Sequence, residues 1–104
     1  MSREDIYRNK FLNLKAAVEA KGYTVRLVPS HKLGDYAGMN PEVARDWGYS
    51  PDNTFDIDSG MSWEKKYRTL VHELKEYGKM KQGWKYWRAH RYASDNEFTI
   101  GGIP

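Results

Sequence analysis

The stretch SWEKKYRTLVHELKEYGKMK, residues 62–81, decides how the chain is organised. Large apolar side chains recur along it at helical spacing and form one stripe: Trp63, Tyr67, Leu70, Leu74 and Tyr77. Gly83 follows at a position where helices commonly end. The pattern predicts an amphipathic helix from about Ser62 to Lys81 that buries one face in a core.

An N-terminal helix is expected over residues 2–21. Ser2 can cap this helix, and Asp5, three residues later, can complete a capping box. Gly22 then lies where a left-handed residue is needed to end the helix.

Three strands are expected between these helices, over residues 23–29, 35–39 and 53–59. A short helix over residues 41–47 is expected between the second and third strands, starting at an Asn-Pro pair. The third strand alternates Phe55 and Ile57 with Asp56 and Asp58. This alternation predicts a half-buried edge strand whose acidic side chains face water, although they could also form an acidic pair beside a metal.

A third helix is expected over residues 84–94, after Gly83. The tail, residues 95–104, lacks a helical pattern and is expected to be a loose end or an added edge strand. The order of elements predicts one α+β domain over residues 1–104. Its parts would be an N-terminal helix, a small antiparallel or mixed three-stranded sheet, a helix of active-site type and a C-terminal helix.

The composition limits the chemistry that the chain can perform. It contains no cysteine, so a metal would have to be held by His, Asp or Glu. No stretch approaches the ~20 apolar residues of a membrane span, and the charged start MSREDIYRNK lacks the apolar core of a secretion signal. We therefore expect a cytoplasmic protein without a membrane partner.

The positive charge is concentrated in one part of the chain. Residues 61–93 hold nine Lys or Arg and three Glu, which gives +6, whereas the whole chain carries +3. This distribution suits an acidic partner or nucleic acid. It is also what a solvated, lysine-rich helix surface would show.

His72, Glu73 and Glu76 lie within about one turn of the 62–81 helix. At ~100° per residue, His72 and Glu76 share a face that points away from the apolar stripe. Their i, i+4 spacing lets two side chains bind one ion, but a solvated face would carry the same residues. If the 84–94 helix folds back, His90 would complete a set of two histidines and one carboxylate, which is known from catalytic zinc sites.

The segment LVHELKEY, residues 70–77, resembles the active-site helix of zincin-like metallopeptidases, whose signature is HExxH. The wider order of elements, over roughly residues 23–93, resembles the smallest zincins, the minigluzincins. This resemblance implies a zinc-activated water that attacks a peptide carbonyl, with Glu73 as the general base. It implies three zinc ligands: His72, Glu76 and His90.

The chain departs from the family pattern at two positions. The second histidine of HExxH is Glu76 here, and the downstream glutamate of the gluzincins corresponds to His90. Zinc accepts both ligand types, but a glutamate in this position should weaken its Lewis acidity. The resemblance therefore implies a weak hydrolase or a relative that has lost the metal. Tyr86 and Tyr92 are candidates for hydrogen bonding to an oxyanion.

An aromatic and basic cluster in the third helix supports a second hypothesis: Trp84, Trp87, Arg88 and Arg91. Stacking rings beside cations can bind single-stranded nucleic acid. The chain could then be a non-enzymatic binding protein, of viral or mobile-element type, that uses this helix on a protein or nucleic acid. Rings at i and i+3 are more often part of a core or an interface patch. We favour a peptide or protein substrate over nucleic acid.

Overall fold

The computed structural model describes residues 1–46, 48 and 51–96. In this part of the chain the elements are α1 (Arg3–Glu19), β1 (Thr24–Val28), the 3₁₀ turn η1 (Ser30–Lys32), β2 (Gly38–Met39), α2 (Pro41–Asp46), β3 (Thr54–Asp58), α3 (Trp63–Lys81) and α4 (Tyr86–Asn96). The three-stranded mixed sheet, with helices before and after it, confirms the expected α+β class.

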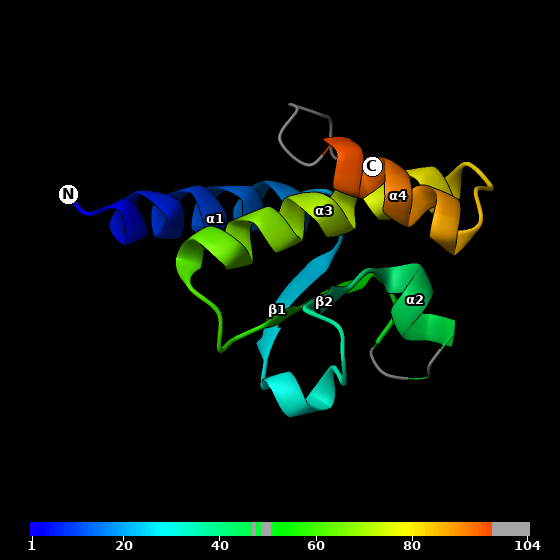
Figure 1. The fold of residues 1–104 in the computed structure, drawn as a ribbon, viewed down its shortest axis with the longest axis horizontal. Coiled ribbons are helices and arrows are strands. Elements are labelled where there is room, and N and C mark those ends of the chain that lie inside the picture. Colours follow the sequence, from blue (N-terminus) through cyan, green and yellow to red (C-terminus); the bar gives the residue numbers. More distant parts are fainter. Residues whose placement is uncertain (47, 49–50, 97–104) are drawn as a thin grey trace.

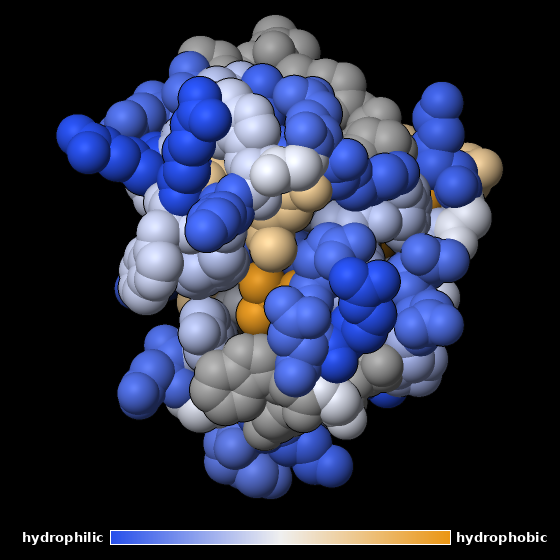
Figure 2. Space-filling view, turned by 90° about the vertical axis from the view of Figure 1, so that its right-hand side faces the viewer, coloured by the Kyte–Doolittle hydropathy of each residue, from blue (hydrophilic) through white to orange (hydrophobic). Residues whose placement is uncertain are grey.

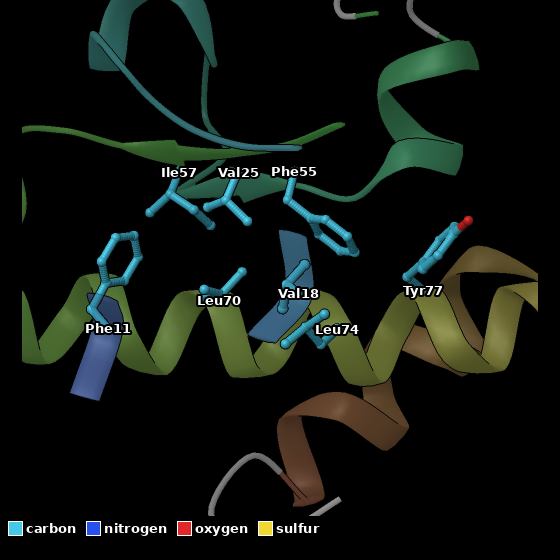
Figure 3. Packing of buried hydrophobic residues seen from close by; sticks show 8 residues of the cluster. All are labelled: Phe11, Val18, Val25, Phe55, Ile57, Leu70, Leu74 and Tyr77. Atoms are coloured by element: carbon cyan, nitrogen blue, oxygen red, sulfur yellow. The ribbon is translucent and has the colours of Figure 1, made fainter. Parts of the chain in front are cut away.

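The long helices form a layer over one face of the sheet. In Figure 1, α1 and α3 run side by side above the strands, and α4 packs against α3. Eight buried hydrophobic side chains fill the space between this layer and the sheet (Figure 3): Phe11, Val18, Val25, Phe55, Ile57, Leu70, Leu74 and Tyr77. Each fully buried side chain of this kind stabilises the fold by about 1.5–3 kcal/mol.

β3 is the central strand of the sheet, whereas the sequence indicated a half-buried strand at an edge. The strand order is β1-β3-β2, with β1 parallel and β2 antiparallel to β3. Asp56 is only 1% exposed, and Arg26 of β1 donates to its carboxylate from Nε at 2.9 Å and from Nη2 at 3.2 Å. The expectation that Asp56 faces water was wrong, because an ion pair allows a carboxylate to be buried in a central strand.

The first helix has the predicted start. The Asp5 N–H donates to Ser2 Oγ at 3.1 Å, and the Ser2 N–H donates to Asp5 Oδ2 at 3.4 Å, which forms the capping box. The helix ends at Glu19, two residues earlier than expected, and Gly22 has φ +96°. The left-handed conformation expected of this glycine is confirmed.

The second strand and the short helix after it also differ from the expected bounds. The second strand is limited to Gly38–Met39 instead of residues 35–39, because the chain turns there and the Tyr36 N–H donates to the Leu33 carbonyl at 3.1 Å. The helix expected over residues 41–47 is described as Pro41–Asp46, and Trp47 lies outside the described residues.

The last two helices are joined by a short connection. Ser62 caps α3 by accepting from the Lys65 N–H at 3.2 Å, and Gly83 reverses the chain with φ +95°. α4 begins and ends two residues later than expected, so that Asp95 and Asn96 belong to the helix. The expectation for residues 97–104 lies outside the described residues.

The surface of the described residues is largely hydrophilic on the face that Figure 2 shows. On the face shown in Figure 2, hydrophilic side chains predominate, and hydrophobic atoms are seen mainly in a narrow region between them. None of the described helices has the length and apolar character needed to cross a membrane.

Candidate metal centre

The return of α4 along α3 brings three potential metal ligands together. His72 and Glu76 lie one turn apart on α3, and His90 approaches them from α4. His90 Nδ1 lies 2.8 Å from Glu76 Oε2, and His72 Nε2 lies 3.2 Å from the same oxygen. The two ring nitrogens are 3.2 Å apart. One atom of each side chain therefore points toward a common centre.

The separations of these three atoms suit a divalent cation. Ligands about 2.0–2.1 Å from a tetrahedral zinc ion are about 3.3 Å from one another, and the observed distances are 2.8–3.2 Å. Hydrogen bonds are possible at the same separations, because an imidazole N–H can donate to Glu76 Oε2 in a suitable tautomer. The three atoms are therefore compatible both with a shared divalent cation and with hydrogen bonds.

The face of α3 that carries His72 and Glu76 is largely buried. The interpretation of this face as a solvated helix surface was therefore wrong. Glu76 is 1% exposed and Glu73 is 6% exposed. The helical wheel correctly separates both residues from the apolar stripe. It does not reveal that α4 and the segment after β2 cover this second face, because those contacts are non-local.

Asn40 is a site residue that sequence reasoning missed. Its Nδ2 donates to Glu76 Oε1 at 2.8 Å, and the residue is completely buried. Its Oδ1 accepts from the N–H groups of Glu42 and Val43 at 2.9 and 3.1 Å, which caps α2. The Asn-Pro pair signals the cap, but no local pattern signals a contact with a side chain 36 residues away.

Glu73 lies beside the three potential ligands and lines the same cavity as His72 and His90. Burial raises the pKa of its carboxyl group well above the usual range, and the negative charge of Glu76 adds to this effect. A hydrogen bond from the Asn40 backbone acts in the opposite direction. A raised pKa is suited to a group that accepts a proton and later returns it.

The two candidate tyrosines lie in different surroundings. Tyr86 stacks on His90 with 5.5 Å between ring centroids, and its hydroxyl lies 3.5 Å from His90 Nδ1. Burial, followed by the charge of Glu76, raises the pKa of Tyr86. Its hydroxyl therefore stays protonated and able to donate. Tyr92 packs on Trp84 at 5.7 Å and is not among the residues lining the cavity.

A cavity of about 550 Å³ opens beside the candidate metal centre. One wall is the edge strand β2 with the segment before it, and the other walls belong to α3 and α4. Gly38 allows the strand to approach α3 closely, because a Cβ there would lie 2.8 Å from Thr69 Cγ2 and 3.0 Å from the Asp56 carbonyl oxygen. The cavity therefore joins a strand edge to two of the three potential ligands, His72 and His90.

The aromatic and basic residues in α4 and just before it have different surroundings. The Arg88 guanidinium lies over Trp84, 3.8 Å from the ring centroid, so these two side chains cover each other. Trp87 is 76% exposed and lines the cavity, with its ring 6.1 Å from that of His90. Arg91 is exposed. Of the two tryptophans in this group, Trp87 therefore has the more exposed ring.

The chain matches no protein-family model, no curated protein and no solved structure.

Proposed function

We propose that the protein is a zincin-like, zinc-dependent hydrolase that acts on peptides. The observation that carries this proposal is the convergence of His72 Nε2, Glu76 Oε2 and His90 Nδ1 at separations of 2.8–3.2 Å. Two histidines and one carboxylate form a ligand set of catalytic zinc sites, which keep a further position open. His72 and His90 line the cavity, so an ion held by these residues would be accessible from it.

The chain's own residues would have distinct roles in this reaction. Zinc, when bound, supplies Lewis acidity toward a water and toward a carbonyl oxygen. Glu73 would accept a proton from the attacking water and return it to the leaving amine. Tyr86 would donate a hydrogen bond to the oxygen of the scissile carbonyl. A glutamate ligand weakens the Lewis acidity of the ion, so we expect low turnover.

The cavity wall supports a peptide as the substrate. β2 lies at an edge of the sheet, and an extended peptide can add to such an edge through main-chain hydrogen bonds. A peptide placed on β2 would pass His72 and His90, because these residues line the same cavity as Gly38 of this strand.

Elemental analysis of untagged protein, purified without a chelator, tests the proposal. We expect about one zinc per chain, lost in His72→Ala and in His90→Ala. His31→Ala is the matched control, because His31 is exposed in η1, away from the site. If wild-type protein holds no metal even after zinc has been added, the proposal is wrong.

A second experiment tests the catalytic role of Glu73. Glu73→Gln should retain zinc and lose peptide hydrolysis, because an amide cannot accept the proton. Undiminished hydrolysis in this variant would exclude Glu73 as the base.

The exposure of Trp87 favours a second candidate function, a binding protein that uses α4. Binding of a single-stranded oligonucleotide should then weaken in Trp87→Ala and in Arg91→Ala, and should fall steeply as salt is added. Such a protein would be unaffected by Glu73→Gln. The absence of salt-dependent binding would exclude the nucleic-acid form of this candidate.

A further inference from the structure

We propose that the cavity selects peptides with an acidic side chain on the C-terminal side of the cleaved bond, and that Lys65 and Arg68 bind this carboxylate. The position of the bond rests on the proposed function, whereas the recognition of the carboxylate depends only on the cavity and its charges.

Lys65 and Arg68 follow the same face of α3 as His72. The three residues are spaced at i, i+3 and i+7, and all of them line the cavity. At about 1.5 Å per residue, Arg68 and Lys65 precede His72 by about 6 and 10 Å along the helix axis. An extended peptide advances about 3.3 Å per residue, so a carboxylate two or three residues from the bond would reach them.

The charges around the cavity leave a cation available on this wall. Among the described residues, Lys65 is exposed and has no ion-pair partner, while Arg68 pairs with Glu64 at 2.9 Å. The acidic residues that line the cavity are Glu73, next to the candidate metal centre, and Asp35, on the segment before β2. The part of α3 around Lys65 therefore attracts a carboxylate, and the opposite wall, which carries Asp35, repels it.

The direction of β2 determines on which side of the bond the acidic residue lies. Gly38 lies against Thr69, and Asn40 lies against Glu76, so β2 and α3 run in the same direction. A peptide paired antiparallel to β2 runs the opposite way, and antiparallel pairing is the more stable arrangement. Its C-terminal part therefore extends toward Arg68 and Lys65.

Matched peptides test this inference through binding. We would titrate acetylated and amidated heptapeptides, in which a single Glu replaces Gln at successive positions, into Glu73→Gln protein. We expect one or two adjacent positions at which Glu lowers the Kd about fivefold, and this preference should weaken as salt is added. Hydrolysis of the same peptides by wild-type protein, read by mass spectrometry, locates the bond relative to the preferred position.

Two charge reversals test the contribution of Lys65. Lys65→Glu should abolish or invert the preference for Glu. Lys85→Glu, the matched control, should retain it, because Lys85 is exposed and does not line the cavity. Equal Kd values for all Glu and Gln peptides, or a preference that persists in Lys65→Glu, would overturn the inference. So would cleavage that leaves the preferred acidic residue on the N-terminal side of the bond.

The inference and the proposed function can fail separately. Cobalt binding, read from its visible spectrum, reports the metal centre without any peptide. The titrations are repeated on metal-free protein. A Glu preference in protein that binds no metal would support the carboxylate site and contradict the hydrolase. A protein that binds metal and shows no Glu preference would overturn the inference and leave the metal centre intact.

Discussion

The Asn40 amide donates from Nδ2 to Glu76 Oε1 at 2.8 Å, while the other oxygen of this carboxylate faces His72 and His90. The contact joins the segment after β2 to the helix that carries two of the three potential ligands. A ligand whose second oxygen is fixed in this way has one orientation toward the metal, which improves metal affinity.

Replacing Asn40 should therefore weaken metal binding. We expect Asn40→Ala to lower zinc affinity by about 10- to 100-fold, measured by competition with a chelating dye. It should also lower the free energy of unfolding by about 1 kcal/mol through loss of the α2 cap.

Asn40→Ser separates these two effects. Serine can still cap α2, but its side chain is too short to reach Glu76. We expect most of the stability to be retained and most of the metal affinity to be lost. Wild-type affinity in Asn40→Ser would show that the contact with Glu76 does not contribute to binding.

Gly38→Ala should destabilise the fold, since the new methyl group would meet Thr69 Cγ2 at 2.8 Å. We expect a loss of about 1–3 kcal/mol in the free energy of unfolding, measured with urea. Thr69→Ser removes that Cγ2 atom, so the double variant should recover part of the loss. If the double variant recovers nothing, the conflict lies with the Asp56 carbonyl at 3.0 Å instead.

Glu73→Gln should stabilise the metal-free protein at neutral pH. The pKa of Glu73 is raised in the folded state, mainly by burial. The unfolded chain ionises near its ordinary value of about 4.3. Stability is therefore fully present below this value and is lost as pH rises through the folded-state pKa. Glutamine does not titrate and avoids that loss.

Melting temperatures at about pH 4 and about pH 7.5 provide the measurement. The gain for Glu73→Gln over wild type should be larger at the higher pH, where about 4–8 °C corresponds to 1 kcal/mol. Glu19→Gln is the control, because Glu19 is exposed on α1. A gain that is the same at both pH values would mean that ionisation of Glu73 does not limit stability.

Zinc should stabilise the folded chain by mass action. At free zinc about 100-fold above Kd, the expected stabilisation is about 2.7 kcal/mol, which raises the melting temperature by roughly 10 °C or more. His90→Ala should show no such shift, whereas His31→Ala should behave like wild type. Equal shifts in wild type and His90→Ala would place the bound zinc elsewhere.

The local elements could be derived from the sequence because their causes are local. The Ser2 and Ser62 caps and the stripe on α3 depend on residues within a few turns of one another. The i, i+4 spacing of His72 and Glu76 likewise places both side chains on one face of α3 before any tertiary contact is considered.

The predictions of side-chain exposure were wrong where the surroundings of the side chain come from residues distant in the sequence. Alternation along β3 indicated an edge strand, because the alternating pattern contains no information about Arg26, which neutralises Asp56 from a neighbouring strand. The position of Glu73 on the helix is compatible with either a solvated or a buried side chain. Its burial depends on what packs against that face of α3.

The sequence by itself determined the helices, the α+β class and a pair of side chains with metal-binding spacing. Only the tertiary structure decided that His90 lies beside that pair and that Asn40 orients Glu76. The physical reason is the range of the interactions involved. Backbone periodicity and capping act over a few residues, whereas the site forms from side chains up to 50 positions apart, from 40 to 90, that meet when α4 packs on α3.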